Sequence, residues 1–289
     1  MARTIGNPFQ WAVAGVGGLG TGLGQAIRGL SGTEGAQPEI RRIAMSDIRE
    51  ALRRGVDDAL AFRSDVLLAV AMYPIIGILL ASAAFDDALL PLVFPMISGF
   101  ALVGPLAAVG LYEMSRRRAA GERIGWGAAF GVLASPSLAA LIVLGGLLLA
   151  LFVVWIGAAA LIYSLTLGPA APAGPVAFAA DVFGTPAGRA MIVVGCIVGF
   201  LFAAAALAVS VVSFPLLVDR RVGVLTAAVT SVRFARANPR PVAAWGAIVV
   251  IGLVLGTLPL FLGLILVMPV LGHATWHLYR AGVEPAGGT

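Results

Sequence analysis

Long apolar segments separated by short polar ones fill the sequence between residues 66 and 280. As a helix rising about 1.5 Å per residue, the first segment is about 28 Å long, close to the thickness of a hydrocarbon layer, and each of the next three is long enough for one crossing. A fifth segment would be about 57 Å long, too long for one crossing, so we expect it to fold back near residues 256–259. The pattern therefore predicts about six membrane spans. The segments are 66–84, 89–112, 138–165, 190–218 and 242–279.

An amphipathic helix is predicted ahead of the first span, over residues 46–63. Ser46 can cap its first turn, and apolar residues recur every fourth position to form one face. That face consists of Ile48, Leu52, Val56 and Leu60. Two interpretations remain open: a helix lying on the membrane surface with its arginines toward anionic headgroups, or a helix that binds a protein partner. A second interfacial helix is expected over residues 124–133.

The composition supports the membrane assignment. Of the 289 residues, 60% are hydrophobic and only 11% are charged, whereas soluble domains are about 25% charged. The expected fold class is therefore all-α, a polytopic transmembrane helical bundle with short interfacial amphipathic helices. We expect four regions: a Gly-rich flexible tail (1–39), a cytoplasmic amphipathic helix (40–65), a six-span domain with a weak internal repeat (66–280) and a C-terminal tail (281–289).

The distribution of arginine predicts the orientation of the chain. Of the 19 basic residues, all arginines, only Arg189 falls on one predicted side of the membrane. The positive-inside rule then places both termini in the cytoplasm, consistent with a bacterial inner membrane. The net charge of +5 marks this side and does not indicate nucleic acid. The arginines expected to meet lipid headgroups are Arg49, Arg53, Arg54, Arg116, Arg117, Arg118, Arg220 and Arg221.

The two histidines are the main candidates for chemistry. His273 and His277 are four residues apart and share one face of a helix. That spacing suits two ligands of zinc, copper or haem iron, and Glu113 could be a third ligand because the internal repeat aligns it with His277. The alternative is interfacial packing, with Trp276 and Tyr279 as anchors. We therefore expect Glu113, His273 and His277 to cluster at the cytoplasmic end, with the cofactor unknown.

The other polar residues predict little chemistry. The pairs Asp57-Asp58 and Asp86-Asp87 are interpreted as solvated charges. The absence of Asp, Glu and Arg from the predicted spans argues against an ion-coupled transporter. No Ser/His/Asp or Cys/His arrangement can be assembled, so we expect no enzyme. GxxxG pairs at 195–199 and 252–256 favour close packing within the monomer.

Three stretches carry a resemblance to a known family: residues 41–67, residues 98–113 with the arginine triplet that follows, and residues 269–280. Across roughly residues 40–280 the chain resembles the bacterial family called domain of unknown function 2189, predicted integral membrane proteins. The resemblance implies a multi-span membrane protein. Some relatives carry the label cytochrome c oxidase, but the family implies no established activity.

These observations favour a non-enzymatic accessory, assembly or regulatory partner of a membrane complex, such as a respiratory oxidase. One alternative is a transporter or channel for an uncharged or apolar substrate, which the repeat and the intramembrane prolines suggest. The other is metal or haem binding through His273 and His277. The expected partners are the bilayer with its anionic headgroups and another membrane protein complex, and not nucleic acid.

The predicted orientation can be tested with reporter fusions. A reporter fused after Arg118 or Arg236 should lie in the cytoplasm, because the arginine-rich segments stay inside. A reporter inserted near Ala173 should lie outside the membrane. Periplasmic reporter activity at both arginine-rich positions would contradict the predicted topology.

Overall fold

The computed structural model describes residues 37–61, 75, 78, 82, 86–122 and 129–284. Within these residues the structure has helices, turns and isolated bridge residues but no β-strand, so the all-α class is confirmed. The helices are α2 (Met45–Ala61), α4 (Val93–Ala107), α5 (Val109–Ala119), α6 (Leu138–Thr166), α7 (Pro175–Gly184), α8 (Pro186–Ser210), α9 (Ser213–Asp219), α10 (Val224–Ala237), α11 (Pro239–Thr257) and α12 (Leu264–Gly282), with short 3-10 turns η2 (Leu90–Leu92) and η3 (Ala129–Ala134).

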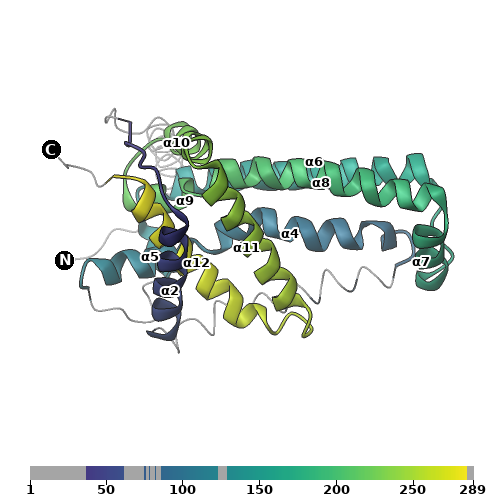
Figure 1. Ribbon diagram of the computed structural model, residues 1–289, viewed down its shortest axis with the longest axis horizontal. Helices are drawn as coiled ribbons and strands as arrows, with labels where there is room; N and C mark the ends of the chain where they lie inside the picture. Colours follow the sequence, from purple (N-terminus) through teal and green to yellow (C-terminus); the bar gives the residue numbers. More distant parts are fainter. Residues whose placement is uncertain are drawn as a thin grey trace, which may run out of the picture.

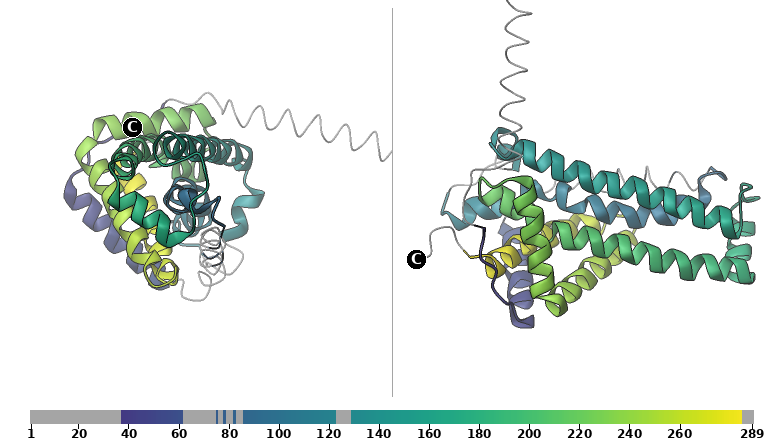
Figure 2. Two further views of the ribbon diagram at one scale, coloured as in Figure 1. Left: turned by 90° about the vertical axis from the view of Figure 1, so that its right-hand side faces the viewer. Right: turned by 90° about the horizontal axis from the view of Figure 1, so that it is seen from above.

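The helices form an elongated bundle with two different ends (Figure 1). α4, α6 and α8 run side by side along the long axis and contact one another. α7 lies at one end, whereas α2, α5, α9, α10 and the last turns of α12 gather at the other. Figure 2 shows the bundle from two further sides, and both views place α10 across the long axis. The arginine-bearing helices therefore share one end of the molecule, which we call the basic end.

Among the described residues, three helical stretches are long and apolar enough to cross a membrane: Leu138–Thr166, Pro186–Asp219 and Pro239–Thr257. They correspond to the predicted third, fourth and fifth spans. The predicted fold-back is confirmed, because α11 and α12 are joined by a turn in which Leu260 and Phe261 have positive φ. The count of six spans is not confirmed. α12 is not among the three stretches, and the predicted first span, 66–84, lies outside the described residues apart from three helical positions.

Proline divides the predicted second span, 89–112. α4 ends at Ala107, two residues after Pro105, and α5 begins at Val109. A proline inside a helix removes one backbone hydrogen bond and crowds the preceding turn, so the axis breaks there. The predicted basic loop after this span is partly helical as well, because Arg116–Arg118 form the last turn of α5.

Two other predicted loops also contain helices. The segment 168–188 holds α7, and the segment 219–241 holds α10. Of the predicted interfacial helix at 124–133, the described part is the 3-10 turn η3. The sequence pattern underestimated these helices because each has too few apolar residues to form a span.

The hydrophobic core is concentrated at the basic end. α9 is almost entirely buried, with Phe214, Leu216 and Leu217 at 0% exposure. By contrast, α6 and α8 expose large apolar side chains along much of their length, such as Leu165 at 77% and Phe200 at 70%. A soluble protein could not leave so much apolar surface in water, so the exposed part of the bundle is suited to a bilayer.

α2 confirms the predicted amphipathic helix but buries a different face from the one expected. Ile48, Ala51, Gly55 and Asp58 are buried, whereas Val56 is 40% exposed and Leu60 is 57% exposed. The buried face meets α12 closely: a Cβ built on Gly55 would lie 2.6 Å from Ala274 Cβ and 2.7 Å from the Val270 carbonyl oxygen. Small residues allow this backbone approach, and the every-fourth-residue pattern did not reveal it.

The segment before α2 is tied to the end of α12. Ile40 and Val283 form an antiparallel bridge, and Arg41 N donates to Gly282 O at 2.9 Å. Asn238, between α10 and α11, accepts a hydrogen bond from Ile43 N at 2.8 Å. The predicted boundary at residues 65–66 therefore separates α2 from the spans in sequence, although α2 packs in one core with α12.

We expect Gly55→Ala to weaken the docking of α2. The added methyl group would clash with the α12 backbone, which should cost about 1–3 kcal/mol of stability and expose α2 to trypsin at Arg53 and Arg54. Gly146→Ala is the matched control, because a Cβ there meets nothing within 4 Å. The comparison is made by limited proteolysis in mild detergent. Equal digestion of the two variants would contradict close α2–α12 packing.

Candidate functional site

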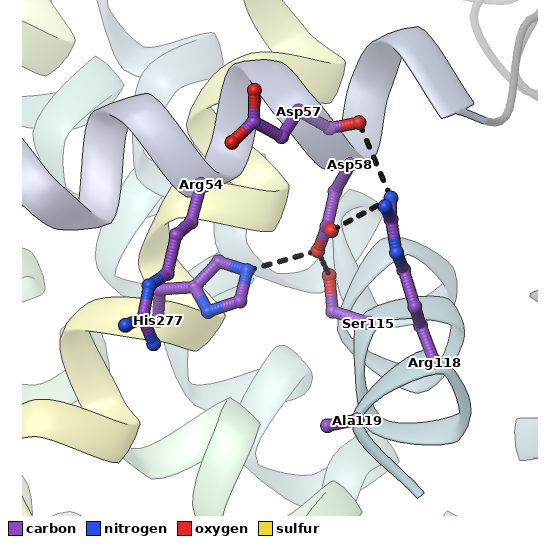
Figure 3. Close-up of a pocket in the computed structure, with 7 residues that line it drawn as sticks. All are labelled: Arg54, Asp57, Asp58, Ser115, Arg118, Ala119 and His277. Carbon is purple, nitrogen blue, oxygen red and sulfur yellow. Dashed lines mark hydrogen bonds and ion pairs between the residues drawn. The ribbon is translucent and has the colours of Figure 1, made fainter. Parts of the chain in front are cut away.

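A buried carboxylate joins three helices at the basic end. Asp58 on α2 accepts a hydrogen bond from Ser115 Oγ at 2.6 Å, and its Oδ2 lies 2.9 Å from His277 Nε2. Its other oxygen is 3.0 Å from Arg118 Nη1. Figure 3 shows Ser115 and Arg118 reaching Asp58 from α5 and His277 reaching it from α12. We call Asp58, Ser115, Arg118, His273 and His277 the Asp58 network.

The network places charge where water is scarce. The Asp58 side chain is 7% exposed, whereas that of the adjacent Asp57 is 53% exposed. Burial raises the pKa of the Asp58 carboxyl, but hydrogen bonds from His277 and Ser115 outweigh this effect, and the pKa lies below its ordinary value. Asp58 is therefore ionised at neutral pH and buried, whereas the sequence suggested a solvated charge.

The hydrogen-bond directions follow from this ionised state. A carboxylate can only accept, so the Ser115 hydroxyl proton points to Asp58. Ser115 Oγ also lies 2.8 Å from His273 Nδ1, and because its proton is already used, it accepts there from an Nδ1–H of His273. The chain of donors runs from His273 to Ser115 to Asp58, with His277 as a second donor to Asp58.

This arrangement differs from a nucleophilic triad. In a triad one histidine accepts the serine proton while a carboxylate holds its other nitrogen. Here Ser115 donates to the carboxylate itself, and Asp58 holds a different histidine, His277, from the one beside Ser115. A Ser/His/Asp grouping was not predicted from the sequence, and the grouping that forms has the donor directions of a structural network.

A shallow pocket of about 340 Å³ opens beside the network. Both signs of charge line it, and Figure 3 shows the Asp57 carboxylate directed away from Asp58. The lining residues are Arg54, Asp57, Asp58, Ser115, Arg118, Ala119 and His277. Because its cations already meet carboxylates, the pocket offers little unpaired charge to a ligand.

The predicted cluster is partly rearranged. His273 and His277 do enter one network, but Glu113 pairs with its own helix, accepting from Arg116 Nε at 2.7 Å and Arg117 Nε at 2.6 Å. Burial raises the pKa of Glu113, and the two arginines lower it by more, so it falls below its usual range. Within the described residues, no group of three or more His, Cys, Asp and Glu side chains is placed to hold a metal ion.

The arginines predicted to meet lipid differ in their surroundings. On α2, Arg53 and Arg54 both pair with Glu50. Arg220 exposes only 14% of its side chain and lies beside Asp219. Arg220 is thus more buried than Arg53 and Arg54, and its contact with a lipid headgroup stays a prediction. The triplet on α5 is likewise engaged with carboxylates, Arg116 and Arg117 with Glu113 and Arg118 with Asp58.

A second carboxylate ties α12 to α9. Asp219 Oδ2 accepts from Tyr279 Oη at 2.7 Å and from Arg280 Nη1 at 3.4 Å. The last two turns of α12 are thus held from one side by Asp58 through His277 and from another by Asp219. The predicted anchors Trp276 and Tyr279 are almost fully buried, at 1% and 0% exposure, so they pack in the core instead of forming an interfacial belt.

The helical architecture with its long apolar spans defines the class of protein: an integral membrane protein of the α-helical type. Residues 93–219 match the model of the family described as Predicted integral membrane protein (DUF2189), which confirms the resemblance predicted from the sequence. The matched part runs from α4 through α9 and includes one of the three stretches that carried the resemblance. No curated protein and no solved structure matches the chain.

We expect Asp58→Asn to destabilise the basic end by about 1–3 kcal/mol, because His277 and Arg118 lose a charged partner in a buried site. Asp57→Asn, at the exposed neighbour, should change stability by less than about 0.5 kcal/mol. Urea unfolding in mild detergent, followed by tryptophan fluorescence, compares the two. A similar loss in both variants would contradict the buried network.

The same pair of variants tests the pH dependence. The pKa of Asp58 is lower in the folded protein than the value of about 4 in an unfolded chain. Its contribution to the free energy of unfolding is therefore fully present above about pH 4. That contribution is lost as the pH falls through the folded-state pKa. Acid should therefore destabilise the wild type and Asp57→Asn more steeply than Asp58→Asn.

Proposed function

We propose that the protein is a non-enzymatic membrane subunit that packs against, assembles or regulates another membrane complex. A respiratory oxidase is one such complex. We further propose that it lies in a bacterial inner membrane with the basic end in the cytoplasm. The charge asymmetry of the sequence supports this orientation, as does the gathering of α2, α5 and α10 at one end (Figure 1).

The observation that carries the proposal is the open surface of α8. In the most apolar part of the Pro186–Asp219 span, 6% of the residues are buried inside the protein, compared with 33% for α6. Lipid can cover such a surface, because acyl chains are as apolar as leucine. α8 contacts α4 and α6 over part of its circumference, and its remaining surface is available to other helices.

A small residue on α8 makes that surface suitable for close helix contact. A Cβ built on Gly199 of the GxxxG pair would lie 3.0 Å from the Trp155 ring. A Cβ built on Gly195 would meet nothing within 4 Å. The pair at 252–256 faces α12, as expected for packing within the monomer. Gly195 thus leaves a gap in the α8 surface that the chain's described residues do not fill, where another helix could approach.

The polar site supports a structural role over a catalytic one. The Asp58 network uses its donors and acceptors among α2, α5 and α12, and the adjoining pocket is shallow. Metal or haem binding through His273 and His277 is less well supported, because both rings already take part in hydrogen bonds. A transporter for an uncharged substrate is the alternative, which the internal repeat suggests.

Association can be tested with two glycine variants. Gly195→Leu should abolish co-purification of the partner complex in mild detergent, because the larger side chain fills the gap on α8 without a clash inside the chain. Gly146→Leu, at a similarly open position on α6, should leave co-purification unchanged. Blue native electrophoresis and mass spectrometry measure the associated proteins. A monodisperse wild-type protein with no stoichiometric partner would contradict the proposal.

A further inference from the structure

α10 has two chemically different faces. One face is buried and consists of Ala227, Thr230, Ser231 and Phe234. On the other, Leu225, Val229, Val232 and Arg236 follow one another at spacings of four, three and four residues, which aligns them along one stripe. Leu225 is 72% exposed and Val229 is 40% exposed. The fold therefore leaves an apolar stripe of α10 uncovered.

The position of α10 explains how such a stripe could be covered. The helix connects the Pro186–Asp219 span, which ends in α9, to the Pro239–Thr257 span, which is α11. It lies across the long axis of the bundle, as Figures 1 and 2 show together. A helix that joins two spans and runs across their direction lies along the membrane surface and does not pass through it.

The charge on α10 is uniformly positive. Its sequence holds Arg233 and Arg236 and no acidic residue, and Arg240 follows in the first turn of α11. Arg233 donates to the side-chain oxygen of Gln37 at 2.6 Å, and this partner is neutral. On α2, in contrast, Arg53 and Arg54 share the carboxylate of Glu50. α10 is therefore the better match for a negatively charged surface.

We propose that α10 is an in-plane anchor that binds anionic phospholipid headgroups. Leu225 and Val229 insert at the boundary of the acyl chains, while Arg236 and Arg240, with Arg233 beside them, contact the phosphates. An apolar stripe next to arginines fits a lipid surface better than a free phosphate or a nucleic acid, because neither of these covers apolar side chains. The proposal is independent of the proposed function, since lipid binding needs no protein partner.

Lipid selectivity at α10 can be measured on the full-length chain in vesicles. In a Cys196→Ser background, Val229→Cys carries an environment-sensitive fluorophore next to the arginines. Quenching by brominated phosphatidylglycerol is compared with quenching by brominated phosphatidylcholine. We expect the anionic lipid to associate more strongly, by about fivefold for each arginine that contacts a headgroup, and the preference to shrink as salt is raised.

Charge variants separate an arginine effect from a folding defect. Arg233→Gln, Arg236→Gln and Arg240→Gln combined should bring the two lipids to nearly equal quenching, whereas Lys at the same three positions should keep the preference. Arg189→Gln, at the first turn of α8 and the opposite end of the bundle, is the matched control and should change nothing. Equal quenching of the wild type by both lipids would overturn the proposal. The absence of quenching by either lipid would also overturn it, because α10 would then face water or a protein partner.

Discussion

The close contact between α2 and α12 determines how the basic end is built. Gly55 brings the two backbones so near that no side chain fits between them, and Asp58, almost one turn further along α2, is carried into the same interface. A carboxylate removed from water is costly unless it is paired. Ser115 and Arg118 of α5 and His277 of α12 supply the partners. One small residue thus makes a three-helix polar junction necessary.

The two ends of the molecule are stabilised by different means. At the basic end, large side chains such as Phe214 and Trp276 are buried, and carboxylates meet hydroxyl, imidazole and guanidinium donors. Along α8 the chain buries little of itself, and stability must come from backbone hydrogen bonds within each helix and from a surrounding apolar phase. The buried basic end and the exposed apolar part of the bundle meet where the spans leave the core, next to α9 and α10.

Apolar runs could be predicted from the sequence because their length and composition respond to one constraint, the thickness of the bilayer. α6 begins at the predicted residue and ends one residue later than predicted, and the fold-back before α12 is where expected. The polar contacts could not be predicted, because they depend on which helix faces approach. The stripe Ile48-Leu52-Val56-Leu60 outweighed the small face of Ala51 and Gly55, so Asp58 was interpreted as solvated. The internal repeat placed Glu113 beside His277, whereas its partners in the structure are arginines of its own helix.

The Asp58 network also connects parts of the chain that the family comparison treats differently. Residues 93–219 contain Ser115 and Arg118 on α5, whereas Asp58 precedes this region and His277 follows it. Glu113, by contrast, finds both arginine partners within α5. A polar group that is satisfied inside one helix imposes nothing on the rest of the fold. Asp58 needs donors from two other helices, so the position of α2 depends on α5 and α12 at once, and a change at any of the three alters the docking of the others.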